Sequence, residues 1–176
     1  TLIELLLSLS LGSMLFVVLL QLIGADLRLG NSMASRLRES AQQRQTLELI
    51  RGELAIGSGW EVDPTPSHQW TCGMAGRQPV LAIGLDSRNS QASTQTIVYS
   101  VGAAPSAIWR GQVLMRCGPA YGLDGVIRPE GKAQNRVLID GLPKEGLGFQ
   151  ARQDAHSRVL HLELEQESLA GSSRLR

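Results

Sequence analysis

The opening of the chain constrains its fold more than any other stretch, because it is one long apolar run. No residue from Leu5 to Ala25 carries a charge. At about 1.5 Å of rise per residue, a helix over this run is long enough to cross a hydrocarbon layer of about 30 Å. We therefore expect residues 1–25 to form a helix that lies in a membrane or in the core of a helical assembly.

A single charge, Glu4, precedes this run. Carrying a carboxylate into lipid or into a packed core of helices is costly unless a cation neutralises it. The nearest cation in the chain is the α-amino group of the first residue, and the amino terminus of a neighbouring copy is the alternative. The second alternative predicts that several chains assemble through these helices.

The motif Thr1-Leu2-Ile3-Glu4-Leu5, followed by the apolar run, resembles the amino terminus of mature type IV pilins and of the pseudopilins of type II secretion. In that family, Phe-Thr-Leu-Ile-Glu-Leu follows a short leader that is cleaved off. The family's glutamate is the fifth residue and its first residue is an N-methylated aromatic. The resemblance therefore implies one further residue before Thr1 in the mature protein, and cleavage of the leader one residue later is the alternative.

The apolar run lacks the proline that members of this family often carry near its end. Gly12 and Gly24 are then the positions where the helix could bend. The alternative for the run is a plain membrane anchor or a secretory signal peptide. A signal peptide ordinarily has basic residues ahead of a shorter apolar core, and this sequence opens without one. We therefore favour the pilin-like interpretation.

Beyond Gly24 the sequence becomes amphipathic, with apolar residues recurring at helical spacing on one stripe. The stripe consists of Leu22, Ala25, Leu29, Met33, Leu37, Ala41, Leu47, Ile50 and Leu54. The other faces carry Arg28, Arg36, Arg38, Glu39, Gln42, Gln43, Arg44, Glu48 and Arg51. We expect the helix to continue over residues 26–56, to end before Gly57-Ser58-Gly59, and to offer its stripe to the remainder of the chain.

Residues 57–176 are about as long as one ordinary domain and alternate strand-like segments with turn formers. The expected strands cover residues 80–85, 95–101, 107–110, 112–116, 136–140, 147–151 and 158–165. Residues 60–78 contain Pro64 and Pro66, so we expect a loop there, and residues 118–134 read as a long connector. The predicted fold class is α+β, with a long N-terminal helix packed against an antiparallel β-sheet head.

The two cysteines, Cys72 and Cys117, lie on either side of the first predicted strands of the head. If the head is exported, its compartment is oxidising, and an even number of cysteines then favours one disulfide. Unpaired buried thiols are the alternative. Neither cysteine has a close second ligand in the sequence, so we do not expect a metal site.

The sequence offers no set of residues suited to catalysis. His68, His156 and His161 are scattered, and Asp154 lies near His156 without a nucleophile. We also find no phosphate-binding loop and no nucleophile elbow. We therefore predict that the protein is not an enzyme and needs no cofactor. The chain carries 17 basic and 16 acidic residues, and dispersed basic residues in the head leave nucleic-acid binding possible but unsupported.

The resemblance implies a structural subunit of a type IV pilus-like filament. Its implied partners are other pilin subunits, a prepilin peptidase, an inner-membrane assembly platform, and the membrane before assembly. The head would lie on the non-cytoplasmic side and then in an extracellular or periplasmic filament. The order of residues 97–100, 108–110 and 137–150 resembles larger minor pilins of the W type and J-type pseudopilins, which favours a minor subunit. The alternatives are a type II secretion pseudopilin and a pilus-borne adhesin or DNA-binding subunit.

Overall fold

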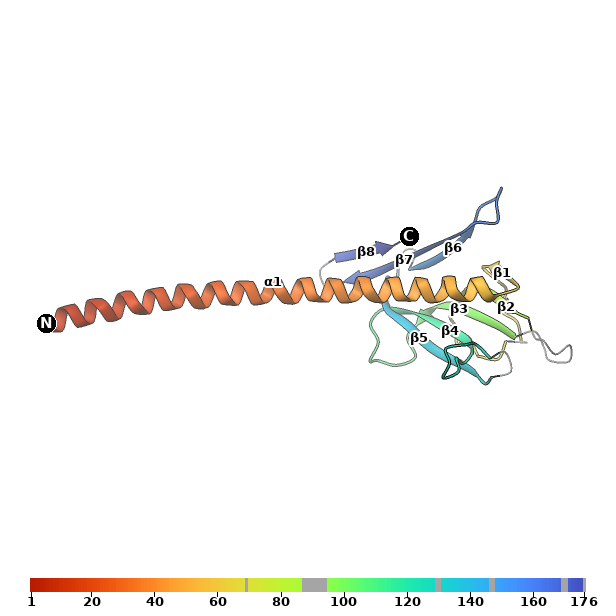
Figure 1. Cartoon of the computed structure of the whole chain (residues 1–176), viewed down its shortest axis with the longest axis horizontal. Helices are drawn as coiled ribbons and strands as arrows, with labels where there is room; N and C mark the ends of the chain where they lie inside the picture. The colour runs from red at the N-terminus through yellow and green to blue at the C-terminus, as the bar shows by residue number, and fades with distance from the viewer. Residues whose placement is uncertain (69, 87–94, 129–130, 146–147, 169–170, 176) are drawn as a thin grey trace. The chain divides into compact units, whose positions relative to one another are not determined.

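The computed structural model describes residues 1–68, 70–86, 95–128, 131–145, 148–168 and 171–175, leaving aside the side chains of residues 25–29, 31–32, 168 and 171–175. In this part of the chain one helix precedes eight strands (Figure 1). They are α1 (Leu2–Ile56), β1 (Gly59–Val62), β2 (Gln78–Leu85), β3 (Gln95–Ala103), β4 (Gln112–Pro119), β5 (Ala133–Leu142), β6 (Phe149–Gln153), β7 (Leu160–Ser168) and β8 (Gly171–Leu175). The chain divides into two compact units, Thr1–Glu39 and Ser40–Arg176.

The strands form two antiparallel sheets, both within the second unit. The five-stranded sheet has the order β1-β2-β3-β4-β5, and the three-stranded sheet has the order β6-β7-β8. Each strand therefore pairs with its neighbour in the sequence, as antiparallel strands joined by short connections can. The register places Trp60 opposite Ile83, Val98 opposite Cys117, and Ala151 opposite Leu162. The predicted α+β class, a long helix followed by antiparallel strands, is confirmed.

Six of the seven predicted strands correspond to strands of the structure, β2 to β7. The predicted strand over residues 107–110 is wrong. There the Trp109 amide donates to the Ser106 carbonyl oxygen at 3.4 Å, in a turn that lets β4 fold back beside β3. The expected loop over residues 60–78 is partly wrong as well, because its first residues belong to β1. The sequence also gave no sign of β8.

The helix ends at Ile56, as the sequence predicts, and its end lies directly against the five-stranded sheet. The Gly57 amide donates to the Glu53 carbonyl oxygen at 3.0 Å, and the Ser58 amide donates to the Gly84 carbonyl oxygen at 2.9 Å. A Cβ atom at Gly57 would lie 2.5 Å from Cγ2 of Ile83. Glycine at this position therefore permits the close approach between the end of α1 and β2.

The core of the second unit combines the two sheets with one face of α1. Leu47 and Ile50 of the helix belong to the same buried cluster as Leu81 of β2, Ile139 of β5 and Leu164 of β7. Burying these side chains is the main favourable contribution to the stability of the head.

The buried face of α1 differs from the predicted apolar stripe. Leu37 and Met33 belong to that stripe, yet their side chains are 70% and 56% exposed. Instead, three polar residues of α1 are buried: Gln43, Thr46 and Glu53. They lie close to Leu47 and Ile50 along the helix. The spacing of the buried residues is still helical. The prediction was wrong in placing Gln43 on an exposed face, and it gave Thr46 and Glu53 no place on the helix.

Candidate functional sites

The surface of α1 from Leu2 to Ile23 is wholly apolar apart from Glu4, three serines and a glutamine, and every large apolar side chain on it is exposed. Over Leu2–Gly24 the mean hydropathy is 2.3, which is enough for a membrane-spanning helix, although a signal sequence has the same properties. Ser8 and Ser10 donate hydrogen bonds to the carbonyl oxygens of Leu5 and Leu7 at 3.0 and 2.9 Å. Satisfying these hydroxyls on the helix itself suits a surface that contacts lipid or other helices.

At the start of this surface, Glu4 pairs with the first residue of its own chain. The Thr1 α-amino group donates to Glu4 Oε2 at 2.5 Å, and the Thr1 hydroxyl donates to the same oxygen at 3.1 Å. Both partners are about four-fifths exposed, at 82% and 80%. Because the carboxylate is exposed, an amino group from outside the chain can also reach it.

The helix keeps its conformation through Gly12 and Gly24, the two positions where the sequence suggested a bend. A Cβ atom at either glycine would meet no atom within 4 Å. Packing within one chain therefore does not require glycine at these positions.

In the head, Cys72 and Cys117 form the expected disulfide. The S–S distance is 1.97 Å and the two Cα atoms are 5.9 Å apart. The bond joins the segment before β2 to the end of β4. It lies in a small apolar cluster with Ala82 and Val98, against which Trp70 packs. Trp60 of β1 is also partly buried, against the main core.

An ionic cluster composed of Glu53, Tyr99, Arg116 and Tyr121 joins α1 to the five-stranded sheet, and all of its members except Tyr121 are buried. Arg116 Nε donates to Glu53 Oε1 at 2.7 Å, and the Tyr121 hydroxyl donates to the same oxygen at 2.5 Å. The Tyr99 hydroxyl donates to Glu53 Oε2. Both oxygens of the carboxylate are thus engaged, and the guanidinium also lies 5.2 Å from the centre of the Tyr121 ring.

The environment of this cluster keeps both tyrosines protonated. Burial raises the pKa of the Tyr99 hydroxyl far above its ordinary value, and the negative charge of Glu53 raises it further. Burial and the hydrogen bond to Glu53 raise the pKa of Tyr121 in the same direction. Two neutral hydroxyls and one guanidinium therefore act together as donors to a single carboxylate, an arrangement suited to holding elements in place.

A second buried polar contact ties α1 to both sheets. Gln43 Nε2 donates to Gln166 Oε1 at 3.2 Å, and Gln166 Nε2 donates to the Asp140 carbonyl oxygen at 2.9 Å. The three residues belong to α1, β7 and β5. Since both glutamines are 1% exposed, this contact fixes the helix and the sheets in one register.

The histidines and Asp154 do not form a site. Asp154 accepts hydrogen bonds from the Ser157 hydroxyl at 2.7 Å and from the His156 amide at 3.3 Å. The hydrogen bond from the Ser157 hydroxyl, followed by that from the His156 amide, lowers the pKa of the Asp154 carboxyl. Both contacts belong to the exposed turn between β6 and β7. His161 is exposed on β7. Among the described residues, no group of three histidine, cysteine or acidic side chains is arranged to hold a metal ion.

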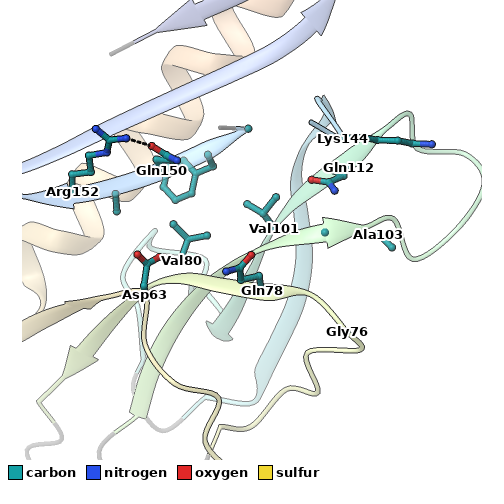
Figure 2. Close-up of a pocket in the computed structure, with 14 residues that line it drawn as sticks. Asp63, Gly76, Gln78, Val80, Val101, Ala103, Gln112, Lys144, Gln150 and Arg152 are labelled. Carbon is teal, nitrogen blue, oxygen red and sulfur yellow. Dashed lines mark hydrogen bonds between the residues drawn. The ribbon is translucent and has the colours of Figure 1, made fainter. Parts of the chain in front are cut away.

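A pocket of about 680 Å³ opens between β6 and the ends of β2, β3 and β4 (Figure 2). Its polar lining residues include Asp63, Gln78, Gln112, Lys144, Gln150 and Arg152, and its apolar ones include Val80, Val101 and Phe149. The sequence analysis did not anticipate this pocket, because its walls come from strands that are far apart in the sequence.

No family model matches this sequence, and the comparisons with curated proteins and with solved structures find no similar protein. The resemblance to type IV pilins therefore depends on the residues at the start of the chain and on the order of elements that follows them.

Proposed function

We propose that this chain is a structural subunit of a type IV pilus-like filament, and a minor subunit rather than the main one. The observation that carries the proposal is the surface of α1 from Leu2 to Ile23. It is an exposed, uninterrupted apolar helix with one carboxylate at its start, and the same helix continues into the core of a folded head.

In this proposal the membrane holds the subunit before assembly, after a prepilin peptidase has removed the leader. An assembly platform then draws the helix from lipid into a bundle with the helices of other subunits. Apolar side chains lose no favourable surroundings in this exchange, because lipid and packed helices are both apolar. Assembly therefore needs a polar contact to choose the register of the helices.

Glu4 supplies that contact in the proposed filament. Its carboxylate pairs with the amino terminus of the adjacent subunit. A charge pair in a dry core fixes a register strongly, because the unpaired alternative is costly, whereas its net stabilisation is reduced by desolvation. The disulfide of the head supports the proposed location outside the cytoplasm, where such bonds persist.

The test is the substitution Glu4→Leu in the full-length protein, produced in cells that assemble the filament. We expect the variant to reach the membrane fraction but to be absent from sheared filaments, or strongly reduced in them. The matched control is Glu48→Leu, which makes the same change at an exposed position of the same helix. Incorporation of the Glu4→Leu variant at the control's level would contradict the proposed role of Glu4.

A further inference from the structure

The pocket between β6 and the ends of β2, β3 and β4 is lined by polar side chains whose hydrogen-bonding groups are mostly unused within the described part of the chain. Asp63, Gln78 and Gln112 line it, and their side chains make no hydrogen bond or ion pair with another described residue. Gln150 accepts a hydrogen bond from Arg152 Nη2 at 3.0 Å through its Oε1, which leaves its Nε2 group to donate. Asp63 and Gln78 are exposed, and Gln112 and Gln150 are half-buried, so a ligand can reach all four.

These side chains surround a small apolar patch (Figure 2). Asp63 and Gln78 lie on one side of the pocket, and Gln150 of β6 lies on the opposite side. Val80 and Val101 lie between them, and Val101 is only partly buried. The volume of about 680 Å³ is within the range of about 300–1,000 Å³ that is usual for binding pockets. The pocket thus combines polar walls with an apolar floor.

The backbone of the pocket wall has an unusual conformation at Asp63. Its φ is 48°, in the left-handed region that residues other than glycine rarely adopt. The Asp63 amide donates to the Val80 carbonyl oxygen at 2.9 Å, which holds the turn after β1 against β2. Two glycines of the lining, Gly76 and Gly148, lie in the same region, with φ values of 78° and 47°. Residues held in such conformations are concentrated at functional sites, which supports a binding role for this wall.

The polar groups of the pocket indicate the chemistry of the ligand. A carboxylate only accepts hydrogen bonds, whereas a glutamine amide both donates and accepts them. A hydroxyl suits both groups, because it donates one hydrogen bond and can accept two. A small molecule that meets Asp63 and three glutamines at once needs several hydroxyls, and it needs a face of carbon-bound hydrogens to cover Val101. A saccharide ring has both features.

We propose that this pocket binds a saccharide unit. Neighbouring hydroxyls of the ring donate to the Asp63 carboxylate, and one face of the ring packs on Val101. Other hydroxyls exchange hydrogen bonds with the three glutamines, Gln78, Gln112 and Gln150. This proposal does not depend on the filament role, because every residue that carries it lies in the head.

The test is saturation-transfer difference NMR on the full chain, held in micelles of a detergent without a sugar headgroup, with empty micelles as blank. The probes are the methyl glycosides of glucose, galactose, mannose and N-acetylglucosamine. The reference compound is tetrahydropyran-2-methanol, a similar ring with a single hydroxyl. We expect saturable binding of at least one glycoside with a dissociation constant of about 10 mM or less, and no saturable binding of the reference compound.

Variants of the wall locate the binding. Asp63→Asn keeps the size of the side chain and its tolerance of positive φ, and it should weaken glycoside binding about tenfold by removing a charged acceptor. Gln78→Leu should weaken it about fivefold through the loss of neutral hydrogen bonds. The matched control is Asp86→Asn, which changes an exposed carboxylate outside the pocket lining and should leave binding unchanged.

Three results would overturn the proposal. In the first, no glycoside binds at about 10 mM, or only a capped valine-threonine dipeptide does. In the second, the reference compound binds as well as the glycosides, so that the hydroxyls are not recognised. In the third, Asp63→Asn and Gln78→Leu bind the glycoside as the parent protein does, or Asp86→Asn weakens binding as much as they do.

Discussion

Glu53 and Arg116 form an ion pair at 2.7 Å inside the head, with side chains that are 1% and 5% exposed. The two residues are 63 positions apart in the sequence and belong to α1 and β4. Since Tyr99 and Tyr121 donate to the same carboxylate, one helical residue holds two strands and the connector after β4. This contact is a buried polar attachment of the helix end to the five-stranded sheet.

Replacing Glu53 by alanine should destabilise the head by about 3–5 kcal/mol, because Arg116 would remain buried without its counter-charge. Urea unfolding of the full chain in detergent micelles, followed by tryptophan fluorescence, measures this loss. The control is Glu48→Ala, an exposed carboxylate on the same helix, which should change the free energy of unfolding by less than about 0.5 kcal/mol. Similar values for the two variants would mean that the ion pair does not hold the head together.

The hydroxyls of the two tyrosines in the cluster should differ in how much they stabilise the head. Tyr99 is fully buried, whereas the Tyr121 side chain is 40% exposed. Tyr99→Phe removes a buried hydrogen-bond donor that water cannot replace. We therefore expect the free energy of unfolding to fall by about 1.5–3 kcal/mol. Tyr121→Phe should lower the free energy of unfolding by less, because water can reach the position that the hydroxyl leaves. The same unfolding measurement compares the two, and an equal or reversed order would contradict the structure of the cluster.

The head should become less stable as pH rises above the ordinary pKa of tyrosine, about 10. In the folded state the pKa values of Tyr99 and Tyr121 are raised, by burial first and then by Glu53. Between the ordinary and the raised pKa, the unfolded chain loses protons that the folded chain keeps. Alkaline conditions therefore favour unfolding, and the stabilisation is complete only below about pH 10.

This pH dependence has a direct spectroscopic measure, since these are the two tyrosines of the chain. Tyrosinate absorbance should stay low until the head unfolds and then rise together with the loss of tryptophan signal. The double substitution Tyr99→Phe with Tyr121→Phe should flatten the dependence of stability on pH in this range. Gradual titration of either tyrosine near pH 10 in the folded protein would show that the hydroxyls are not protected.

Reducing the disulfide should destabilise the head without removing its fold. Cys72 and Cys117 are 45 positions apart, and closing a loop of that length restricts the unfolded chain by about 4 kcal/mol. We expect a reducing agent to lower the urea midpoint, and the double substitution Cys72→Ser with Cys117→Ser to lower it by a similar amount. The double variant should not respond to the reducing agent. A response there would point to a cause other than this bond.

Much of the fold follows from sequence periodicity. The end of α1 at Ile56 is marked by the glycines after it, and alternation identifies β7, whose Leu162 and Leu164 are buried. The disulfide follows from the number of cysteines and the expected compartment. These features are local, or depend on composition, so one sequence is enough to predict them.

The polar interior could not be predicted in the same way. Gln43 was assigned to an exposed face, and Glu53 received no role, because a hydrophobic pattern places polar residues at the surface. Their burial is compensated by partners that are 123 and 63 positions away. A single sequence does not show which distant donor meets which acceptor. The pocket beside β6 was missed for the same reason, since its walls meet only in the folded head.

Two glycines near the end of α1 should respond in opposite directions to alanine. At Gly57 a Cβ atom would lie 2.5 Å from Cγ2 of Ile83, a fully buried side chain with little room to move. We expect Gly57→Ala to destabilise the head by about 1–3 kcal/mol through this overpacking. At Gly52, inside the helix and exposed, a Cβ atom would meet nothing within 4 Å. Gly52→Ala should therefore stabilise the protein by about 0.5–1 kcal/mol, and equal urea midpoints for the two variants would contradict the close contact between α1 and β2.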